Sequence, residues 1–158
     1  MGMPESDRLA VWAAFLRAHA TVLAKLEREL QDERDLPLTW YDVLFQLNAA
    51  DAELRMQELA RSVLLSKSGL TRLVDRMESA GLVARRTCDA DRRGTWVGLT
   101  EEGRATLRRA APVHLRGVSE HFVDRLGDED LAALKAALDK VLGQPAPADP
   151  ACDEHILN

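Results

Sequence analysis

Apolar residues recur at helical spacing over most of this chain. From Leu9 to Leu30 they keep mostly to one face, which predicts a long N-terminal helix. A second helical pattern runs from Thr39 to Leu47, and Pro37 marks the break because a proline cannot continue the first helix. The Thr39 hydroxyl is suited to capping this second helix. We therefore expect two helices in the first third of the chain.

The C-terminal part shows the same periodicity. Thr100 can cap a long helix, and Asp128 can cap a last helix that carries a stripe of leucines and valine. Together the terminal segments, about 8–34 and 101–142, carry more apolar surface than one small lobe can cover. We expect these helices to pair with those of a second chain and form a homodimer.

A helix-turn-helix is predicted between Leu54 and Gly81. A short helix from Arg55 to Val63 is followed by a turn and by a second helix that Ser66 can cap. The apolar face of the second helix consists of Leu70, Leu73, Val74 and Met77. The rest of this second helix carries hydroxyl and basic side chains, which can form hydrogen bonds with base edges and phosphates of DNA. These candidate DNA-binding residues are Ser66, Lys67, Ser68, Thr71, Arg72 and Arg76.

Two segments with strand-forming residues, 82–86 and 95–99, follow this helix, and the turn-rich run 88–94 lies between them. They predict a hairpin whose loop holds Arg92 and Arg93. A narrow minor groove attracts an inserted arginine, and a helix just before such a hairpin can lie in the major groove. We therefore expect a mainly α winged helix-turn-helix with a small β-wing, which binds double-stranded DNA.

The charge of this chain is unevenly distributed along the sequence, which the overall composition does not show. The formal net charge is −5, which by itself argues against nucleic acid. Between Leu54 and Trp96, however, nine basic and five acidic residues give a local charge of +4, so the remainder carries −9. This segregation directs attraction for phosphates to one lobe.

Three motifs occur in a fixed order. Glu58-Leu59-Ala60 is followed by the run from Ser66 to Ala80-Gly81-Leu82-Val83, and then by Asp91-x-Arg93, five residues and Leu99-Thr100. The ordered set resembles the helix-turn-helix and wing signature of the MarR family of bacterial transcription regulators. With the flanking long helices, the resemblance covers roughly residues 8–143.

The resemblance implies a two-fold dimer that binds a pseudo-palindromic operator, and we expect a sequence-specific repressor. It also implies a ligand cleft formed by the first, second and fifth helices. The matching positions are Trp12, Phe15, Leu16, His19, Trp40, Leu44 and His114. An aromatic wall with one polar group suits a small aromatic or phenolic acid. We expect such a ligand to release the protein from its operator.

Two alternatives stay open. His19, His114 and His121 could converge with a carboxylate such as Glu120 on zinc, which would make a zinc-responsive regulator, although this is not the spacing of a strong metal motif. The protein could also be a constitutive architectural DNA-binding protein without a ligand. Neither a nucleophile elbow nor a glycine-rich phosphate loop is present in the sequence, so we expect no enzyme and no cofactor.

The chain length suits one domain. We expect it to span residues 1–143, with a DNA-reading lobe at about 54–99, and to be followed by a flexible tail at 144–158 that is rich in proline and alanine. The sequence has no uninterrupted run of about 18 apolar residues and no signal peptide pattern. We therefore expect a soluble, cytoplasmic protein with no membrane partner.

Overall fold

The computed structural model describes residues 4–63, 67–88 and 91–143. Within these residues the fold is mainly α with one small antiparallel sheet, as the apolar pattern predicted. The helices are α1 (Glu5–Arg34), α2 (Leu38–Ala49), α3 (Met56–Ser62), α4 (Lys67–Ser79), α5 (Glu101–His121) and α6 (Asp128–Leu142), with a 3-10 turn η1 (Val123–Arg125). The strands are β1 (Leu54–Arg55), β2 (Val83–Cys88) and β3 (Asp91–Leu99).

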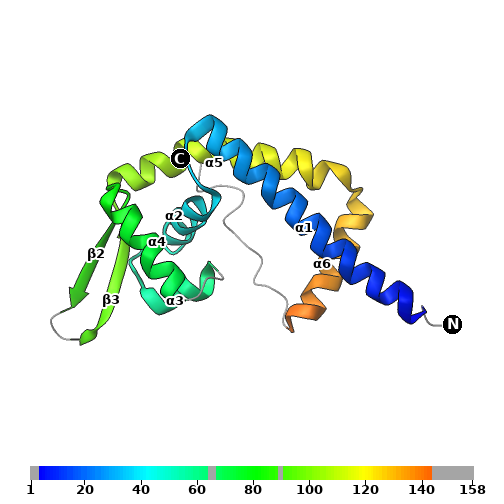
Figure 1. The fold of residues 1–158 in the computed structure, drawn as a ribbon, viewed down its shortest axis with the longest axis horizontal. Helices are drawn as coiled ribbons and strands as arrows, with labels where there is room; N and C mark the ends of the chain where they lie inside the picture. The colour runs from blue at the N-terminus through cyan, green and yellow to red at the C-terminus, as the bar shows by residue number, and fades with distance from the viewer. Residues whose placement is uncertain (1–3, 64–66, 89–90, 144–158) are drawn as a thin grey trace.

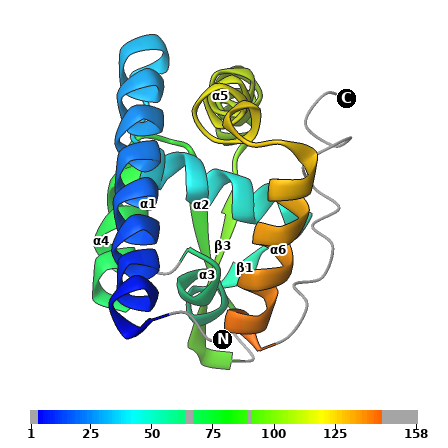
Figure 2. The same ribbon diagram turned by 90° about the vertical axis from the view of Figure 1, so that its right-hand side faces the viewer.

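The elements form two parts (Figure 1). Helices α2, α3 and α4 and the sheet make a winged lobe, and α1, α5 and α6 make a helical arm that extends from it. Helices α1 and α5 lie side by side in both ribbon views (Figures 1 and 2). The β2–β3 hairpin projects from the lobe on the side away from α5 (Figure 2). The helix-turn-helix and the wing, which are consecutive in the sequence, therefore lie together at one end of the molecule.

The core lies where the arm meets the winged lobe. Leu26 and Leu30 of α1 are buried there together with most apolar side chains of α2. The predicted stripe of α4 is buried in full and faces this core. The other fully or nearly fully buried apolar residues include Leu59, Leu82, Val83, Val97, Leu107, Ala110, Ala111 and Val113. Burial of the stripe turns the opposite side of α4 to solvent.

The sheet differs from the predicted two-stranded hairpin in two ways. A third strand, β1, pairs with β3, so that the order is β1-β3-β2. The hairpin strands are also longer than the predicted segments, and the register shifts between Thr87 and Cys88. Periodicity could not indicate β1, because two residues are too few to show an alternation. The loop residues 89–90 lie outside the described part of the chain.

One predicted helix cap is confirmed, and a glycine ends the preceding helix. Thr100 begins α5, where its hydroxyl accepts a hydrogen bond from the Gly103 N–H at 3.0 Å. The same hydroxyl donates to the Gly81 carbonyl at 2.6 Å and so joins the start of α5 to the end of α4. Gly81 has the left-handed φ of 75° that favours glycine. Its position after α4 lets the Leu82 N–H bond back to the Met77 carbonyl at 3.0 Å.

Two other predicted caps are wrong. Helix α2 begins at Leu38, so Thr39 lies inside its first turn. The Leu38 N–H donates to the Glu27 carboxylate of α1 at 3.0 Å, a long-range cap that local sequence cannot reveal. Helix α6 begins at Asp128 itself, with Gly127 as the preceding cap residue. Ser66, the predicted cap of α4, and the predicted tail 144–158 lie outside the described residues.

A line of polar contacts joins α1 to α5. His121 Nε2 contacts the Glu29 carboxylate, and Arg116 forms an ion pair with Glu33. Further along, the next residue of α1, Arg34, donates from its Nε to the carbonyl oxygen of residue 109 at 2.8 Å. Along this line of contacts the residue numbers increase on α1 and decrease on α5, so the two helices run antiparallel. Gly117 permits their close approach, since a Cβ there would lie 2.6 Å from Leu26 Cδ2.

Much of the arm's apolar surface has no cover within one chain. Leu9 is 65% exposed, and Val141 is 83% exposed. Trp12, Phe15, Leu16, Leu23, Phe122, Val123 and Leu142 are exposed as well. Within the described residues, α1 is long and apolar enough by length and composition to cross a membrane. The same composition is that of a helix whose apolar face is covered by another chain.

Candidate DNA-binding surface

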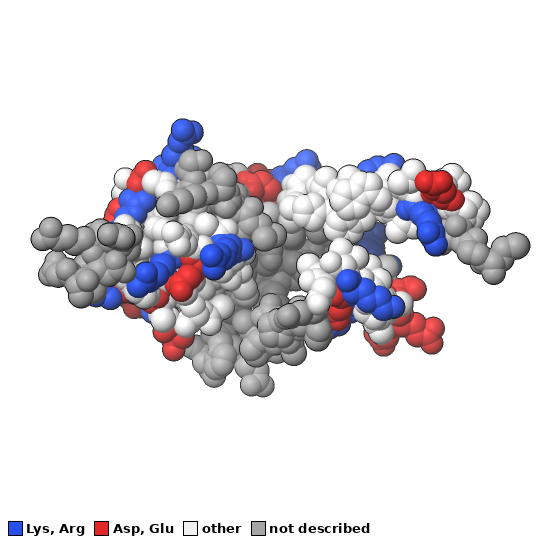
Figure 3. All heavy atoms as spheres, turned by 90° about the horizontal axis from the view of Figure 1, so that it is seen from below, with Lys and Arg blue, Asp and Glu red and all other residues white. Residues whose placement is uncertain are grey.

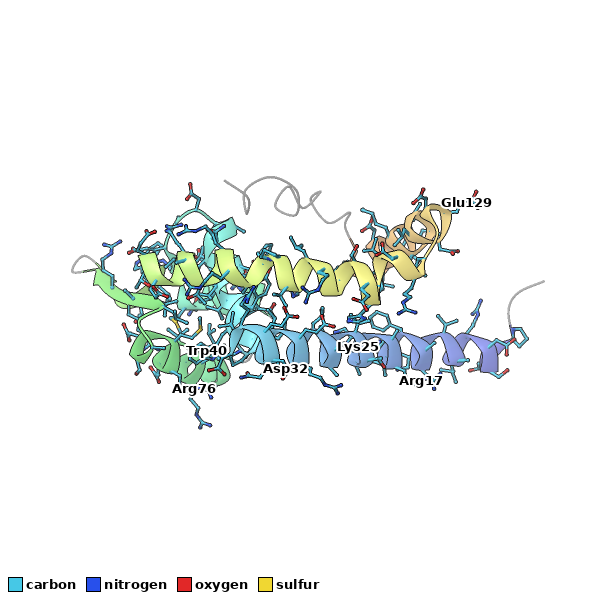
Figure 4. All side chains as sticks on the ribbon, turned by 90° about the horizontal axis from the view of Figure 1, so that it is seen from above. Arg17, Lys25, Asp32, Trp40, Arg76 and Glu129 are labelled. Carbon is cyan, nitrogen blue, oxygen red and sulfur yellow. The ribbon has the colours of Figure 1, made fainter. Side chains whose placement is uncertain are left out.

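Helix α4 presents polar and basic side chains on the side opposite its buried stripe. Thr71, Arg72 and Arg76 are exposed. Figure 4 shows Arg76 pointing away from the body of the protein. Arginine forks and threonine hydroxyls can bond both base edges and phosphates. Lys67 and Ser68 begin the same helix, and for these two residues only the backbone is described.

The wing stands on the same lobe as α4 (Figure 1). Its two strands pair in register from Val83 opposite Leu99 to Thr87 opposite Thr95. Arg92 and Arg93 belong to the first part of β3, with only the backbone described. Both therefore lie near the tip of a hairpin next to α4, which is the relative order of reading helix and wing that the sequence predicted.

Arg85 of β2 joins the wing to α4. Its guanidinium lies 2.5 Å from Asp75 Oδ1 and 3.1 Å from Glu78 Oε2, and it donates to the Thr71 carbonyl at 3.1 Å. The Arg85 backbone N–H also donates to Glu78 Oε1 at 2.9 Å. In the sequence, Arg85 could be recognised only as one of the nine basic residues between Leu54 and Trp96. No local pattern could identify this contact, because it forms between a strand and a helix.

The next residue, Arg86, points to the other side of β2. It pairs with Glu53, which lies just before β1, at 2.5 Å, and this hydrogen bond lowers the pKa of the Glu53 carboxyl. Gly98 leaves room for the Glu53 side chain, since a Cβ there would lie 2.9 Å from Glu53 Cγ. The Arg55 guanidinium lies 4.9 Å from the centre of the Trp96 ring, a cation–π distance. Neighbouring arginines on one strand thus make their ion pairs on opposite faces of the sheet, and of the two only Arg85 is paired with α4 in these contacts.

Positive and negative groups lie next to each other on the winged lobe. In Figure 3 blue and red side chains alternate on the part of this lobe that is in view. Where Arg85 pairs with Asp75 and Glu78, a basic group of the same chain neutralises the acidic groups of α4. No such ion pair is recorded for Arg72 or Arg76 within the described part of the chain. Their charges are therefore available to an external anion.

The residues predicted to bind a ligand fall into two groups. On α1, Trp12 stacks on Phe15, and Phe15 stacks on His19. Phe15 and His19 line a cavity of about 460 Å³ between α1, Phe122 and α6, whose remaining lining is aliphatic. Leu16 is exposed on the same helix. The cavity walls are α1 and α6, whereas the resemblance implied α1, α2 and α5.

The second group lies at α2 and α5. His114 stacks on Tyr41 with 4.3 Å between the ring centres, and burial lowers the pKa of its imidazole. His114 Nδ1 is buried without a hydrogen-bond partner. Trp40 is half-buried at the start of α2, while Leu44 is fully buried in the core and has no surface to offer a ligand. In Figure 4 Trp40 lies far from the N-terminal half of α1 that carries Arg17.

The zinc alternative gains no support from the geometry. His121 contacts Glu29 of α1, while the ring of His114 packs against Tyr41 and that of His19 against Phe15. Over residues 4–63, 67–88 and 91–143, no group of three potential metal-ligating side chains is found. Within the described residues, these three histidines thus serve in ring packing and in a hydrogen-bond contact with Glu29.

A model of the MarR family matches residues 34–94, which span α2, the helix-turn-helix and most of the wing. Among curated proteins, an uncharacterized HTH-type transcriptional regulator from Bacillus cereus is 32% identical, over 74% of this chain and 77% of the relative. The other relatives in this group are HTH-type transcriptional regulators as well.

Solved structures give the same result over a longer part of the chain. AbsC, a MarR family transcriptional regulator from Streptomyces coelicolor, is 35% identical with a TM-score of 0.81, covering 90% of this chain and 96% of AbsC. A second MarR family regulator from that organism, solved in complex with DNA, is 31% identical with a TM-score of 0.80 and covers 94% of both chains. The similarity therefore extends beyond the winged lobe to the helical arm.

Proposed function

This chain belongs to the MarR family of DNA-binding transcriptional regulators, and from that premise we propose that it is a dimeric repressor of a pseudo-palindromic operator. The observation that carries the proposal is the exposed side of α4. Thr71, Arg72 and Arg76 lie opposite a fully buried apolar stripe, on the second helix of a helix-turn-helix. Such a helix enters the major groove and contacts base edges there.

In this proposal the wing contacts the adjacent minor groove. Arg93, with Arg92, lies near the tip of the hairpin beside α4. The negative potential of a narrow minor groove favours an inserted arginine. Lys67 and Ser68 at the N-terminal end of the reading helix, with Ser66 before them in the sequence, complete the proposed surface. The solved complex of a 31% identical family member with DNA supports this class of ligand.

Selection from a randomised DNA library tests the function. The wild-type protein should enrich one sequence motif with inverted symmetry and bind it at least a thousandfold more tightly than a scrambled duplex, as specific DNA-binding proteins do. A constitutive architectural protein would enrich no motif. Fusion of the enriched site to a reporter promoter then tests repression, which requires lower expression when the protein is present.

The exposed apolar face of the arm supports the dimer. Leu9, Trp12 and Leu16 on α1, and Val141 and Leu142 on α6, are exposed in one chain. A contiguous apolar surface of this kind is typical of an interface between copies, and two-fold symmetry would place two winged lobes on one DNA site. Covering this face also accounts for the apolar composition of α1 in a soluble, cytoplasmic protein.

We further propose that a small aromatic acid controls operator binding. The cavity lined by Phe15 and His19 has the size and apolar walls typical of a small-molecule site, and the imidazole offers one polar partner for a carboxylate. Because the cavity lies between α1 and α6, a ligand there acts on the proposed dimer face. A ligand that prefers the DNA-incompetent spacing of the lobes a hundredfold would shift the equilibrium by about 2.7 kcal/mol.

Fluorescence distinguishes the two groups of candidate ligand residues. Aromatic and phenolic acids are titrated against the protein on labelled operator DNA, while tryptophan emission and DNA anisotropy are followed. Release that is lost in His19→Ala but kept in His114→Ala supports the α1–α6 cavity, and the reverse supports the second group of residues, at α2 and α5. Release by micromolar zinc with stoichiometric uptake would contradict the aromatic ligand.

A further inference from the structure

Arg85 of the wing contacts the reading helix through both its side chain and its backbone. Its guanidinium contacts Asp75 at 2.5 Å, Glu78 at 3.1 Å and the Thr71 carbonyl at 3.1 Å. The side chain of Arg85 is only 23% exposed, whereas that of Asp75 is 55% exposed. The arginine therefore lies beneath the acidic residues, between the strand and the helix.

The three partners form a ridge along one side of α4. Thr71, Asp75 and Glu78 are four and three residues apart, so they lie above one another on the helix surface. Arg72 and Arg76, the proposed base- and phosphate-contacting residues, each follow a member of this ridge by one position. A contact that fixes the ridge thus fixes the direction in which the neighbouring arginines leave the helix.

The Glu78 carboxylate holds the strand as well as the side chain. One oxygen accepts from the Arg85 backbone N–H at 2.9 Å, and the other lies 3.1 Å from the guanidinium. Helix α4 and strand β2 are therefore connected through both the backbone and the side chain of one residue. Since β2 is paired with β3 along the hairpin, the position of the wing is coupled to that of α4.

We propose that Arg85 is a positioning residue for DNA recognition: it holds α4 and the wing in one relative arrangement, so that both meet adjacent grooves of the same DNA site. The inference rests on the proposed function of these two elements. Arg85 itself has no role as a DNA ligand in this proposal, because its guanidinium is used by acceptors of α4.

The planar guanidinium is required by this geometry. A guanidinium presents several N–H donors in a fixed fork, and here the fork meets two carboxylates and a main-chain carbonyl. A lysine keeps the charge but offers one compact ammonium group. Arg85→Lys therefore separates the positioning of α4 from the simple neutralisation of Asp75 and Glu78.

The test uses the full chain and the DNA site that the wild type selects from a random library. Affinity for that site and for a scrambled duplex is measured by anisotropy at several salt concentrations. We expect Arg85→Gln and Arg85→Lys each to lower the ratio of the two affinities about tenfold, with the salt slope for the scrambled duplex unchanged in Arg85→Lys. Arg86→Gln is the matched control, because it breaks the neighbouring ion pair with Glu53 on the opposite face of β2, and it should keep the ratio.

A combined variant separates positioning from charge balance. The triple variant combines Arg85→Gln with Asp75→Asn and Glu78→Gln, so that both acidic groups are removed as well. If this variant recovered the full affinity ratio, neutralisation would be the only role of Arg85. That result would overturn the inference. A ratio unchanged in Arg85→Lys would overturn it too, and this variant decides the matter if Arg85→Gln does not fold. Absence of any preferred site for the wild type would refute the proposed function, and this inference with it.

Discussion

At the scale of single residues, the sequence indicated which residues form the candidate DNA-binding surface. It did not indicate which charged side chains pair with each other. Arg72 and Arg76 could be assigned to the exposed side of α4 because the apolar stripe fixes which side is buried. The contacts of Arg85 with Asp75 and of His121 with Glu29 could not be assigned. Each depends on how two elements pack, which periodicity within one element does not determine.

Arg72→Ala and Arg93→Ala should weaken DNA binding in different ways. Arg72 lies on the reading face of α4, so its loss should change base preference at one position by about 1–3 kcal/mol. Arg93 lies near the wing tip, so its loss should weaken selected and scrambled DNA alike and lower the salt slope by about one. Arg17→Ala, on the arm far from the lobe, should change neither. Anisotropy titrations with single-base variants of the site would contradict these roles if both mutants behaved alike.

His114 should make stability depend on pH. Burial lowers its pKa in the folded protein below the ordinary value of 6.5. The unfolded chain therefore binds this proton more readily, and its contribution destabilises the fold as the pH falls through about 6.5. His114→Phe keeps an aromatic ring against Tyr41 but cannot titrate, so its melting temperature should fall less between about pH 7.5 and 5.5. Equal losses in calorimetry would contradict this role for His114.

At the scale of elements, long segments were predicted well and short or remotely capped ones were not. The periodicity of α1, α4 and α5 extends over several turns, and each of these helices forms where it was expected. Strand β1 has only two residues and depends on pairing with β3. The start of α2 depends on Glu27, eleven residues away on another helix. Tertiary contacts decide both of these boundaries.

Gly103→Ala should disturb the junction between the wing and the arm. A Cβ at residue 103 would lie 2.0 Å from the Leu82 carbonyl oxygen, so α5 or the strand has to move. Overpacking against backbone costs about 1–3 kcal/mol or more. Gly127→Ala is the matched control, because the nearest atom, Asp130 Oδ2, lies 3.9 Å away. Thermal unfolding at equal protein concentration should show a loss of several degrees for residue 103 and a smaller one for residue 127, where alanine is a poorer N-cap than glycine. A loss of the same size at residue 127 would contradict the packing argument.

At the scale of the whole molecule, the excess of apolar surface predicted a partner before any contact was known. The exposed residues of α1 and α6 agree with that expectation, although the sequence could not indicate that the cavity would lie between these two helices. Both helices show an apolar stripe, but α6 follows α5 through the turn from Phe122 to Gly127, so its angle to α1 depends on that turn and on the packing of α5 against α1. Such an angle cannot be derived from periodicity.

Truncation after Gly127 should abolish the dimer. It removes α6 with its exposed Val141 and Leu142 and uncovers more of α1. Truncation after Gly143 is the control, because it removes only residues 144–158 and should leave the dimer intact. Light scattering coupled to size-exclusion chromatography should report monomer or aggregate for the shorter chain. A monodisperse dimer lacking α6 would contradict the proposed interface.

The central claim is that two copies of α4 read two adjacent major grooves, and methylation protection of guanine N7 on the selected DNA site tests it most directly. N7 is exposed in the major groove. We predict two protected clusters on one face of the DNA, about 34 Å or one helical turn apart, with protection in each cluster reduced in Arg72→Ala or Arg76→Ala. Tight binding without N7 protection, or protection that neither substitution changes, would contradict the account.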